Sequence, residues 1–186
     1  MPRPRPSVLL VAALAAAALA GCGAKSDKVT EGTTEGTYLD VGDLKYQVQI
    51  SRLLNPFSRE DRSLLVDVPP SQSLASGQQW FGVFLRVQNT TGGPLPMASR
   101  YQIVDTQGNV FRPIPVGPKN VFVFRPGRLG ANDVFPLANT PAADSTTQGA
   151  LLLFRIPNAD LENRPLEFQI RSPLPPREIG SVALDV

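Results

Sequence analysis

The sequence predicts an all-β protein, a two-sheet antiparallel sandwich of about 7–9 strands. Short segments alternate between apolar and polar residues with a period of two, which is the pattern of strands that bury one face. Prolines are spread along the chain, and all but three of the 19 lie beyond residue 21. Because proline ends helices, this spacing leaves almost no window for a helix of three turns.

The first predicted strands show the alternation most clearly. Every second position is apolar in residues 44–51, at Leu44, Tyr46, Val48 and Ile50, and residues 81–88 repeat the pattern. In residues 101–112, two short apolar segments flank the turn sequence Thr-Gln-Gly-Asn at 106–109. Glycine and asparagine accept positive φ, so we expect a β-hairpin there.

The later part of the chain continues in the same way. Residues 150–156 are almost continuously apolar and end at a proline, which predicts a buried strand in the middle of a sheet. Residues 166–170 alternate again, and residues 182–186 indicate a final strand. Single helical turns are expected at 141–144, which begins with proline, and at 159–162.

The N-terminus has the organisation of a secretory signal. Two arginines precede an apolar segment, residues 8–18, that is too short to span a membrane. The segment ends in four residues that include the only cysteine of the chain: Leu19, Ala20, Gly21 and Cys22. These four residues resemble the lipobox of bacterial lipoproteins. The resemblance implies cleavage after Gly21 and a diacylglycerol thioether on Cys22, with acyl chains such as palmitate in the cell membrane.

These patterns divide the chain into three regions. Residues 1–21 are the signal peptide, and residues 22–37 are the lipidated cysteine followed by a flexible tether. Small and polar residues dominate 23–37 and bury little apolar surface, so as a coil this segment spans roughly 20 Å. Residues 38–186 form one domain, large enough to build a core without disulfides.

Composition excludes several functions. The net charge of +2 includes the arginines of the signal peptide, so the remaining chain is nearly neutral and lacks the basic surface that nucleic acid requires. Histidine is absent and the single cysteine is assigned to lipid, which removes the commonest bases and metal ligands. A Ser–Lys dyad or paired carboxylates remain as catalytic groups, but no Ser-x-x-Lys pattern occurs. We therefore expect no enzymatic activity, no metal site and no cofactor.

Four short motifs follow one another in a recognisable order. They are Val87-Gln88-Asn89 at the end of an apolar strand, Asp105-Thr106-Gln107-Gly108-Asn109, the apolar strand at 151–157 and the alternating strand at 166–170. Together they resemble a bacterial immunoglobulin-like family of secreted lipoproteins and surface proteins, over residues 39–170. The resemblance implies an immunoglobulin-like sandwich, a fold associated with a mycobacterial secreted immunogenic protein. Most members have no assigned function, and the family offers no catalytic residues. Residues 53–79 depart from the family because they are longer and more charged than a simple connection.

Two groups of residues are candidate partner contacts. One group lies in the charged loop at 53–79 and suits a partner carboxylate or a glycan, although mixed charges on a loop are often simply solvated. Its members are Phe57, Arg59, Asp61 and Arg62. The other group, Trp80 and Phe84, shares the strand face opposite Phe81 and Val83. An exposed pair would mark an interface, whereas a pair covered by the 53–79 loop would be core.

The sequence therefore favours an extracytoplasmic lipoprotein on a bacterial cell membrane that presents a β-sandwich as a binding or interaction module. Its partner would be a protein or another envelope component, and no nucleic-acid partner is expected. The alternative is a small-molecule carrier or solute-binding lipoprotein of the cell envelope. In either case catalysis plays no part.

Overall fold

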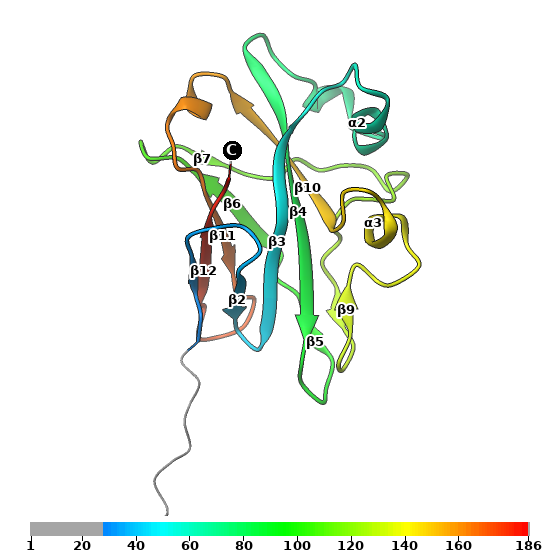
Figure 1. The fold of residues 1–186 in the computed structure, drawn as a ribbon, viewed down its shortest axis with the longest axis vertical. Coiled ribbons are helices and arrows are strands. Elements are labelled where there is room, and N and C mark those ends of the chain that lie inside the picture. The colour runs from blue at the N-terminus through cyan, green and yellow to red at the C-terminus, as the bar shows by residue number, and fades with distance from the viewer. Residues whose placement is uncertain (1–27, 186) are drawn as a thin grey trace, which may run out of the picture.

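The computed structural model describes residues 28–185 as two β-sheets packed against each other (Figure 1). Sheet A has the strand order β1 (Glu31–Gly32), β12 (Ile179–Ala183), β11 (Glu167–Arg171), β6 (Arg100–Val104) and β7 (Val110–Phe111). Sheet B has the order β10 (Ala150–Pro157), β4 (Gln78–Asn89), β3 (Leu44–Leu54) and β2 (Tyr38–Val41), with β9 (Val134–Phe135) also paired to β4. The predicted all-β sandwich is confirmed, and seven of the described strands have four or more residues.

The shorter elements complete the chain. β5 (Leu95–Pro96) and β8 (Arg128–Leu129) pair in a two-stranded sheet of their own. The expected hairpin is present, since β6 pairs with β7 and Gly108 has a φ of 83°. Both expected helical turns are also present, as α3 (Pro141–Asp144) and η3 (Asp160–Glu162). Two further helices, α2 (Arg59–Leu64) and η2 (Pro70–Gln72), lie in the 53–79 connection, for which no helix was expected.

A first core fills the space between the two sheets. It contains alternate residues of the main strands, including Phe81, Phe154 and Phe168, all fully buried. Tyr46 also lies inside and its hydroxyl accepts a hydrogen bond from the amide of Ala98 at 2.7 Å. Burial raises the pKa of Tyr46 to about 12, so the hydroxyl stays neutral.

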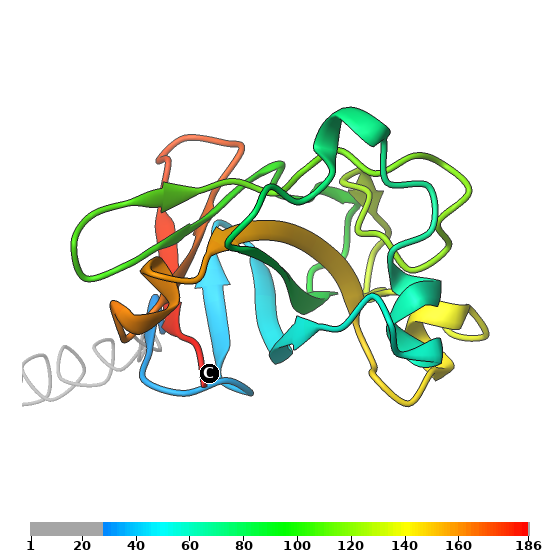
Figure 2. The same ribbon diagram turned by 90° about the horizontal axis from the view of Figure 1, so that it is seen from above.

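A second core lies on the other face of sheet B. The connection that carries α2 and η2, together with residues 113–124, folds over this face (Figure 2). The buried members of this second core are Leu54, Leu64, Trp80, Phe84, Val116, Leu151 and Leu153. Strand β10 therefore contributes to both cores, which explains why its sequence is continuously apolar. The mid-sheet position predicted for it is wrong, because among the described strands it pairs only with β4 and lies at the edge of sheet B. Its other edge is covered by backbone bonds from Leu151 to Phe122 and Phe124, which belong to no strand.

The alternation predicted for residues 44–51 fails at its end. A β-bulge between Val48 and Ile50 shifts the register of β3 against β4. The extra residue reverses the faces, because side chains alternate along a strand. Ile50 is consequently 39% exposed, while Ser51 is buried and bonds through its amide and hydroxyl to the carboxylate of Glu35.

The expected flexible tether is wrong for residues 28–37. Thr30 accepts a backbone hydrogen bond from Ser181, and β1 pairs in parallel with β12. On the other side, the carbonyl of Val29 accepts the amide of Asp40, which belongs to sheet B. These few polar residues are ordered by backbone hydrogen bonds to both sheets and not by apolar burial. Their composition therefore gave no indication that they would be ordered.

Candidate functional site

The residues predicted to contact a partner do not form one surface. Phe57, Arg59 and Arg62 lie at the corner formed by α2, and all three are exposed, Phe57 at 90%. Ser58 caps this helix, since its hydroxyl accepts the amide of Asp61. This corner is the part of the predicted contact set that remains available to a partner.

Asp61 has a structural position in the same corner. The residue is only 6% exposed, and its carboxylate accepts hydrogen bonds from Arg52 at 2.6 Å and from the amide of Asn55 at 2.7 Å. Burial raises the pKa of the Asp61 carboxyl, but these two donors outweigh it and leave the pKa below its ordinary value. Asp61 therefore fixes α2 against β3 and does not face a partner.

Trp80 and Phe84 form no exposed patch. Trp80 is 6% exposed and Phe84 is fully buried, and both belong to the second core. Of the two alternatives, the covered pair is therefore correct and the exposed interface is wrong, because the 53–79 connection covers this face. The predicted cleavage and lipidation residues, Leu19, Ala20, Gly21 and Cys22, lie outside the described residues.

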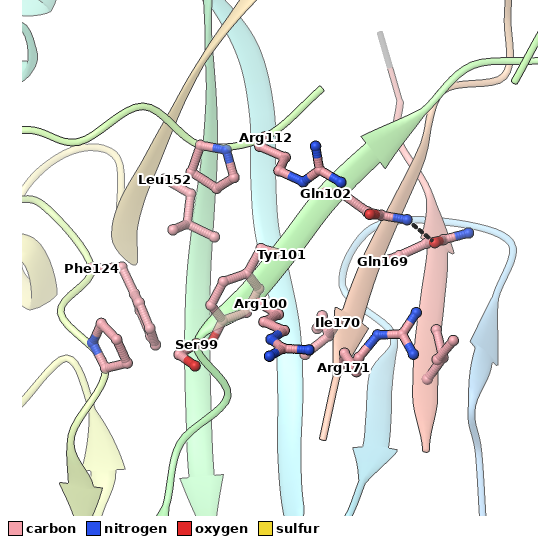
Figure 3. A pocket seen from close by; sticks show the side chains of 13 residues that line it. Ser99, Arg100, Tyr101, Gln102, Arg112, Phe124, Leu152, Gln169, Ile170 and Arg171 are labelled. Carbon is pink, nitrogen blue, oxygen red and sulfur yellow. Dashed lines mark hydrogen bonds between the residues drawn. The ribbon is translucent and has the colours of Figure 1, made fainter. Parts of the chain in front are cut away.

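A cavity of about 490 Å³ opens beside β6 (Figure 3). Strand β7 pairs only with Ile103 and Val104 of β6, so the first half of β6 has no strand on that side. The chain continues into Pro113, which has no amide hydrogen to donate, and the amide of Ile114 then bonds to Leu153 of sheet B at 2.8 Å. The segment thus leaves sheet A for sheet B and leaves an opening between them.

The floor of the cavity is apolar. Tyr101, Phe124 and Leu152 line it, and the rings of Tyr101 and Phe124 meet edge to face with centroids 5.3 Å apart. The Tyr101 hydroxyl donates to the carbonyl of Ala98 at 2.6 Å. Burial raises the pKa of Tyr101 well above its ordinary value, and the nearby Tyr46 adds to this effect. The floor therefore presents neutral, largely hydrocarbon surface.

The rim of the cavity is basic. Arg100, Arg112 and Arg171 line it, together with Gln102 and Gln169, whose side chains are hydrogen-bonded at 2.7 Å. None of the lining residues is acidic. An adjoining hollow of about 140 Å³ is lined by Arg100, Arg171 and Arg177, and it too has no acidic lining residue. The sequence did not predict this site, because Arg100 and Arg171 are 71 positions apart in the chain.

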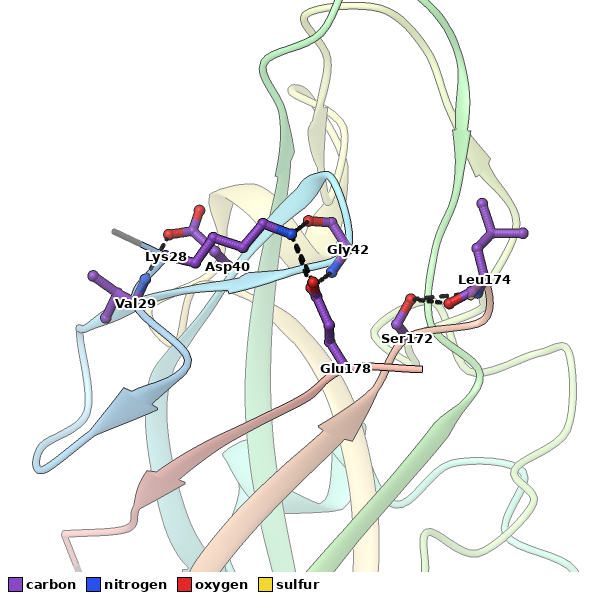
Figure 4. A network of polar contacts seen from close by, with 7 residues as sticks. All are labelled: Lys28, Val29, Asp40, Gly42, Ser172, Leu174 and Glu178. Carbon is purple, nitrogen blue, oxygen red and sulfur yellow. Dashed lines mark hydrogen bonds and ion pairs between the residues drawn. The ribbon is translucent and has the colours of Figure 1, made fainter. Parts of the chain in front are cut away.

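A second polar network fixes the start of the described chain (Figure 4). The Lys28 ammonium contacts the Glu178 carboxylate at 2.8 Å and donates to the carbonyl of Gly42 at 3.1 Å. The same carboxylate accepts the amide of Gly42 at 2.8 Å. The hydrogen bond between the Lys28 ammonium and the Glu178 carboxylate raises the pKa of Lys28 and lowers the pKa of Glu178. The chain thus enters the domain beside the β11–β12 turn, which also carries Arg177.

Neither a metal cluster nor a membrane-spanning helix is found in residues 28–185. Within this range, no group of three or more acidic, histidine or cysteine side chains is arranged to hold a metal ion. No helix in the same range is long and apolar enough to cross a membrane.

Comparison with known proteins gives the fold and no more. No family model matches the chain, and no curated protein matches it. Among solved structures, YjhA of Bacillus subtilis is similar over 82% of this chain and 99% of its own, with 9% identity and a TM-score of 0.50. At that identity the similarity supports a shared sandwich and says nothing of a ligand.

Two further solved structures are similar with lower TM-scores. YcdA of Bacillus subtilis, a candidate lipoprotein, is matched over 80% of this chain with 10% identity and a TM-score of 0.47, and the chain spans only 38% of its length. An uncharacterised β-sandwich protein of Clostridium difficile 630 is matched over 85% of this chain and 95% of its own, with 10% identity and a TM-score of 0.45.

Proposed function

We propose that this protein is a non-catalytic binding module of a bacterial cell envelope, held at the extracytoplasmic face of the membrane by lipid on Cys22. Its ligand site is the cavity beside β6, and this cavity is the observation that carries the proposal. A volume of about 490 Å³ lies within the range of roughly 300–1,000 Å³ for small-molecule sites. The cavity favours a small ligand over a flat protein contact.

The side chains around the cavity suit binding and not catalysis. The lining residues include no carboxylate, lysine or cysteine, and the phenol of Tyr101 has a raised pKa. Such a site holds no group that exchanges a proton readily near neutral pH. An apolar floor with a few polar groups at its rim is instead the usual composition of a ligand pocket.

The anchor is tested by cell fractionation. Unaltered protein is expected to stay with membranes after a carbonate wash, and Cys22→Ala to be released, because acyl chains supply the anchoring free energy. Ser26→Ala is the matched control, since it removes a small polar group near the same end and should change nothing. Retention of Cys22→Ala on washed membranes would show that something other than lipid on this cysteine anchors the chain.

The ligand site is tested by a screen of thermal unfolding against envelope glycans, metals and small solutes. A ligand present at about one hundred times its dissociation constant stabilises the protein by about 2.7 kcal/mol. Ser99→Trp places a bulky group among the lining residues of the cavity and should abolish that stabilisation. Ser63→Trp, on the exposed side of α2, is the control that should preserve it.

The corner at α2 supports a second candidate, contact with a protein partner. Phe57 is 90% exposed and lies two residues before α2, the short helix that carries Arg59 and Arg62. Aromatic and arginine side chains are the residues that most often anchor protein interfaces. A photo-crosslinking residue at position 57 should capture one partner in intact cells, while the same residue at position 128 should not.

A further inference from the structure

Strand pairing places two arginines directly opposite each other at the cavity rim. Arg100 is the register partner of Arg171 in the antiparallel pair of β6 and β11, and Arg171 in turn faces Ile179 of β12. Like charges in directly opposite positions destabilise a sheet. The next row of the same face carries Gln102, Gln169 and Ser181, so the neighbouring row supplies no compensating carboxylate.

The four arginines of this region have no acceptor in the described chain. Within residues 28–185, no ion pair and no side-chain hydrogen bond involves the guanidinium groups of Arg100, Arg112, Arg171 and Arg177. Arg59, Arg62 and Arg86 are likewise without such a partner in this range, but none of them lines this cavity. The cationic groups around the cavity are therefore available to an external anion.

We propose that this rim binds the phosphate group of a phosphate ester whose apolar part lies on Tyr101, Phe124 and Leu152. Guanidinium groups form paired hydrogen bonds to phosphate oxygens, and several can share one phosphate because it offers more oxygens and charge than a carboxylate. The apolar floor lies directly beside the arginines, so a ligand that carries both features contacts both surfaces (Figure 3). This assignment rests on the proposed function and names the ligand class for its cavity.

A phosphate ester reaches the site either as a soluble molecule or as a lipid headgroup. With the lipid on Cys22, the six-residue span from Cys22 to Lys28 reaches at most about 20 Å. Lys28 is fixed to Glu178 (Figure 4), which follows Arg177 in the chain, so this end of the basic surface lies next to the residue at which that span ends. The two sources share the same phosphate chemistry at the rim, and experiment distinguishes them.

The test uses the full lipidated chain in nanodiscs of digalactosyldiacylglycerol, a neutral lipid that carries no phosphate. Phenyl phosphate is added, and its affinity is taken from the rise in the unfolding temperature. We expect the double variant Arg100→Gln/Arg171→Gln to bind it more weakly by at least about tenfold, since a hydrogen bond to a charged group contributes about that much. The control Arg128→Gln/Arg164→Gln removes the same charge from exposed arginines outside the cavity and should bind as the unaltered chain does.

A second arm replaces part of the neutral lipid with phosphatidylglycerol. Stabilisation by this lipid, lost in the double variant, assigns the phosphate to a headgroup, whereas stabilisation by phenyl phosphate alone assigns it to a soluble ester. Equal binding by the double variant and the control overturns the assignment, and so does the lack of binding in both arms. Tight binding of a neutral ligand that is blocked only by Ser99→Trp would overturn the phosphate class while leaving the cavity as a ligand site.

Discussion

Replacing Phe84 by alanine tests whether the second core is part of the folded domain. Phe84 is fully buried among the side chains that the 53–79 connection places on sheet B, and the Arg52 guanidinium lies 5.9 Å from its ring centroid. Truncating a buried phenylalanine costs about 3–5 kcal/mol. In a domain of this size that lowers the unfolding temperature by about 6–20 °C, at about 2–4 °C per kcal/mol.

The chain provides both the control and the reporter for this experiment. Phe57→Ala makes the same chemical change at a side chain that is 90% exposed and should alter stability by less than about 0.5 kcal/mol. Trp80 is the only tryptophan and lies in the second core, so its fluorescence follows unfolding of that core while circular dichroism follows the sheets. A loss of less than about 1 kcal/mol for Phe84→Ala would mean that the connection does not cover sheet B as described.

Three further predictions follow from particular contacts. The free energy of unfolding should rise as the pH increases from about 2 to 5. The reason is that Asp40, Asp61 and Glu178 have pKa values in the folded state below their ordinary ones. Their stabilising contribution is complete above the unfolded-state pKa and is lost as the pH falls through the folded-state pKa. Denaturant titrations at each pH give the free energy of unfolding, which should change less with pH in Asp61→Asn than in the unaltered protein. An equal dependence on pH in that variant would contradict the contacts of the Asp61 carboxylate. Gly180→Ala should destabilise the domain by about 1–3 kcal/mol, because its new Cβ would lie 2.4 Å from the Val41 side chain, whereas Gly127→Ala meets nothing within 4 Å and should be tolerated. Lys28→Ala should make the 28–37 segment sensitive to limited proteolysis, Lys119→Ala should not, and equal resistance of both would show that the contact with Glu178 does not fix the segment.

The sequence predicts those elements whose causes are local. The alternation in β4 and the glycine turn between β6 and β7 are visible in a few neighbouring residues, and so is the proline that begins α3. The continuous apolar run of β10 correctly indicates a buried strand but not its place at the edge of sheet B. These features depend on side-chain period and turn chemistry, which a short window contains.

The remaining features depend on contacts between distant segments. The bulge in β3 is visible only from its register with β4, and the order of residues 28–37 depends on bonds to β12 and β2. The basic rim arises because antiparallel pairing brings the first residue of β6 beside the last residue of β11. No property of Arg100 or Arg171 in its own sequence neighbourhood distinguishes it from a solvated surface arginine.

The pairing of the N-terminal segment with both sheets has a mechanical consequence. Thr30 bonds to Ser181 of one sheet, and Val29 bonds to Asp40 of the other. With the proposed anchor on Cys22, the chain would be pulled at this end whenever a bound ligand or the surrounding fluid moved. Because the segment is bonded to both layers where it enters them, that tension would be shared between them and would not act on one layer alone.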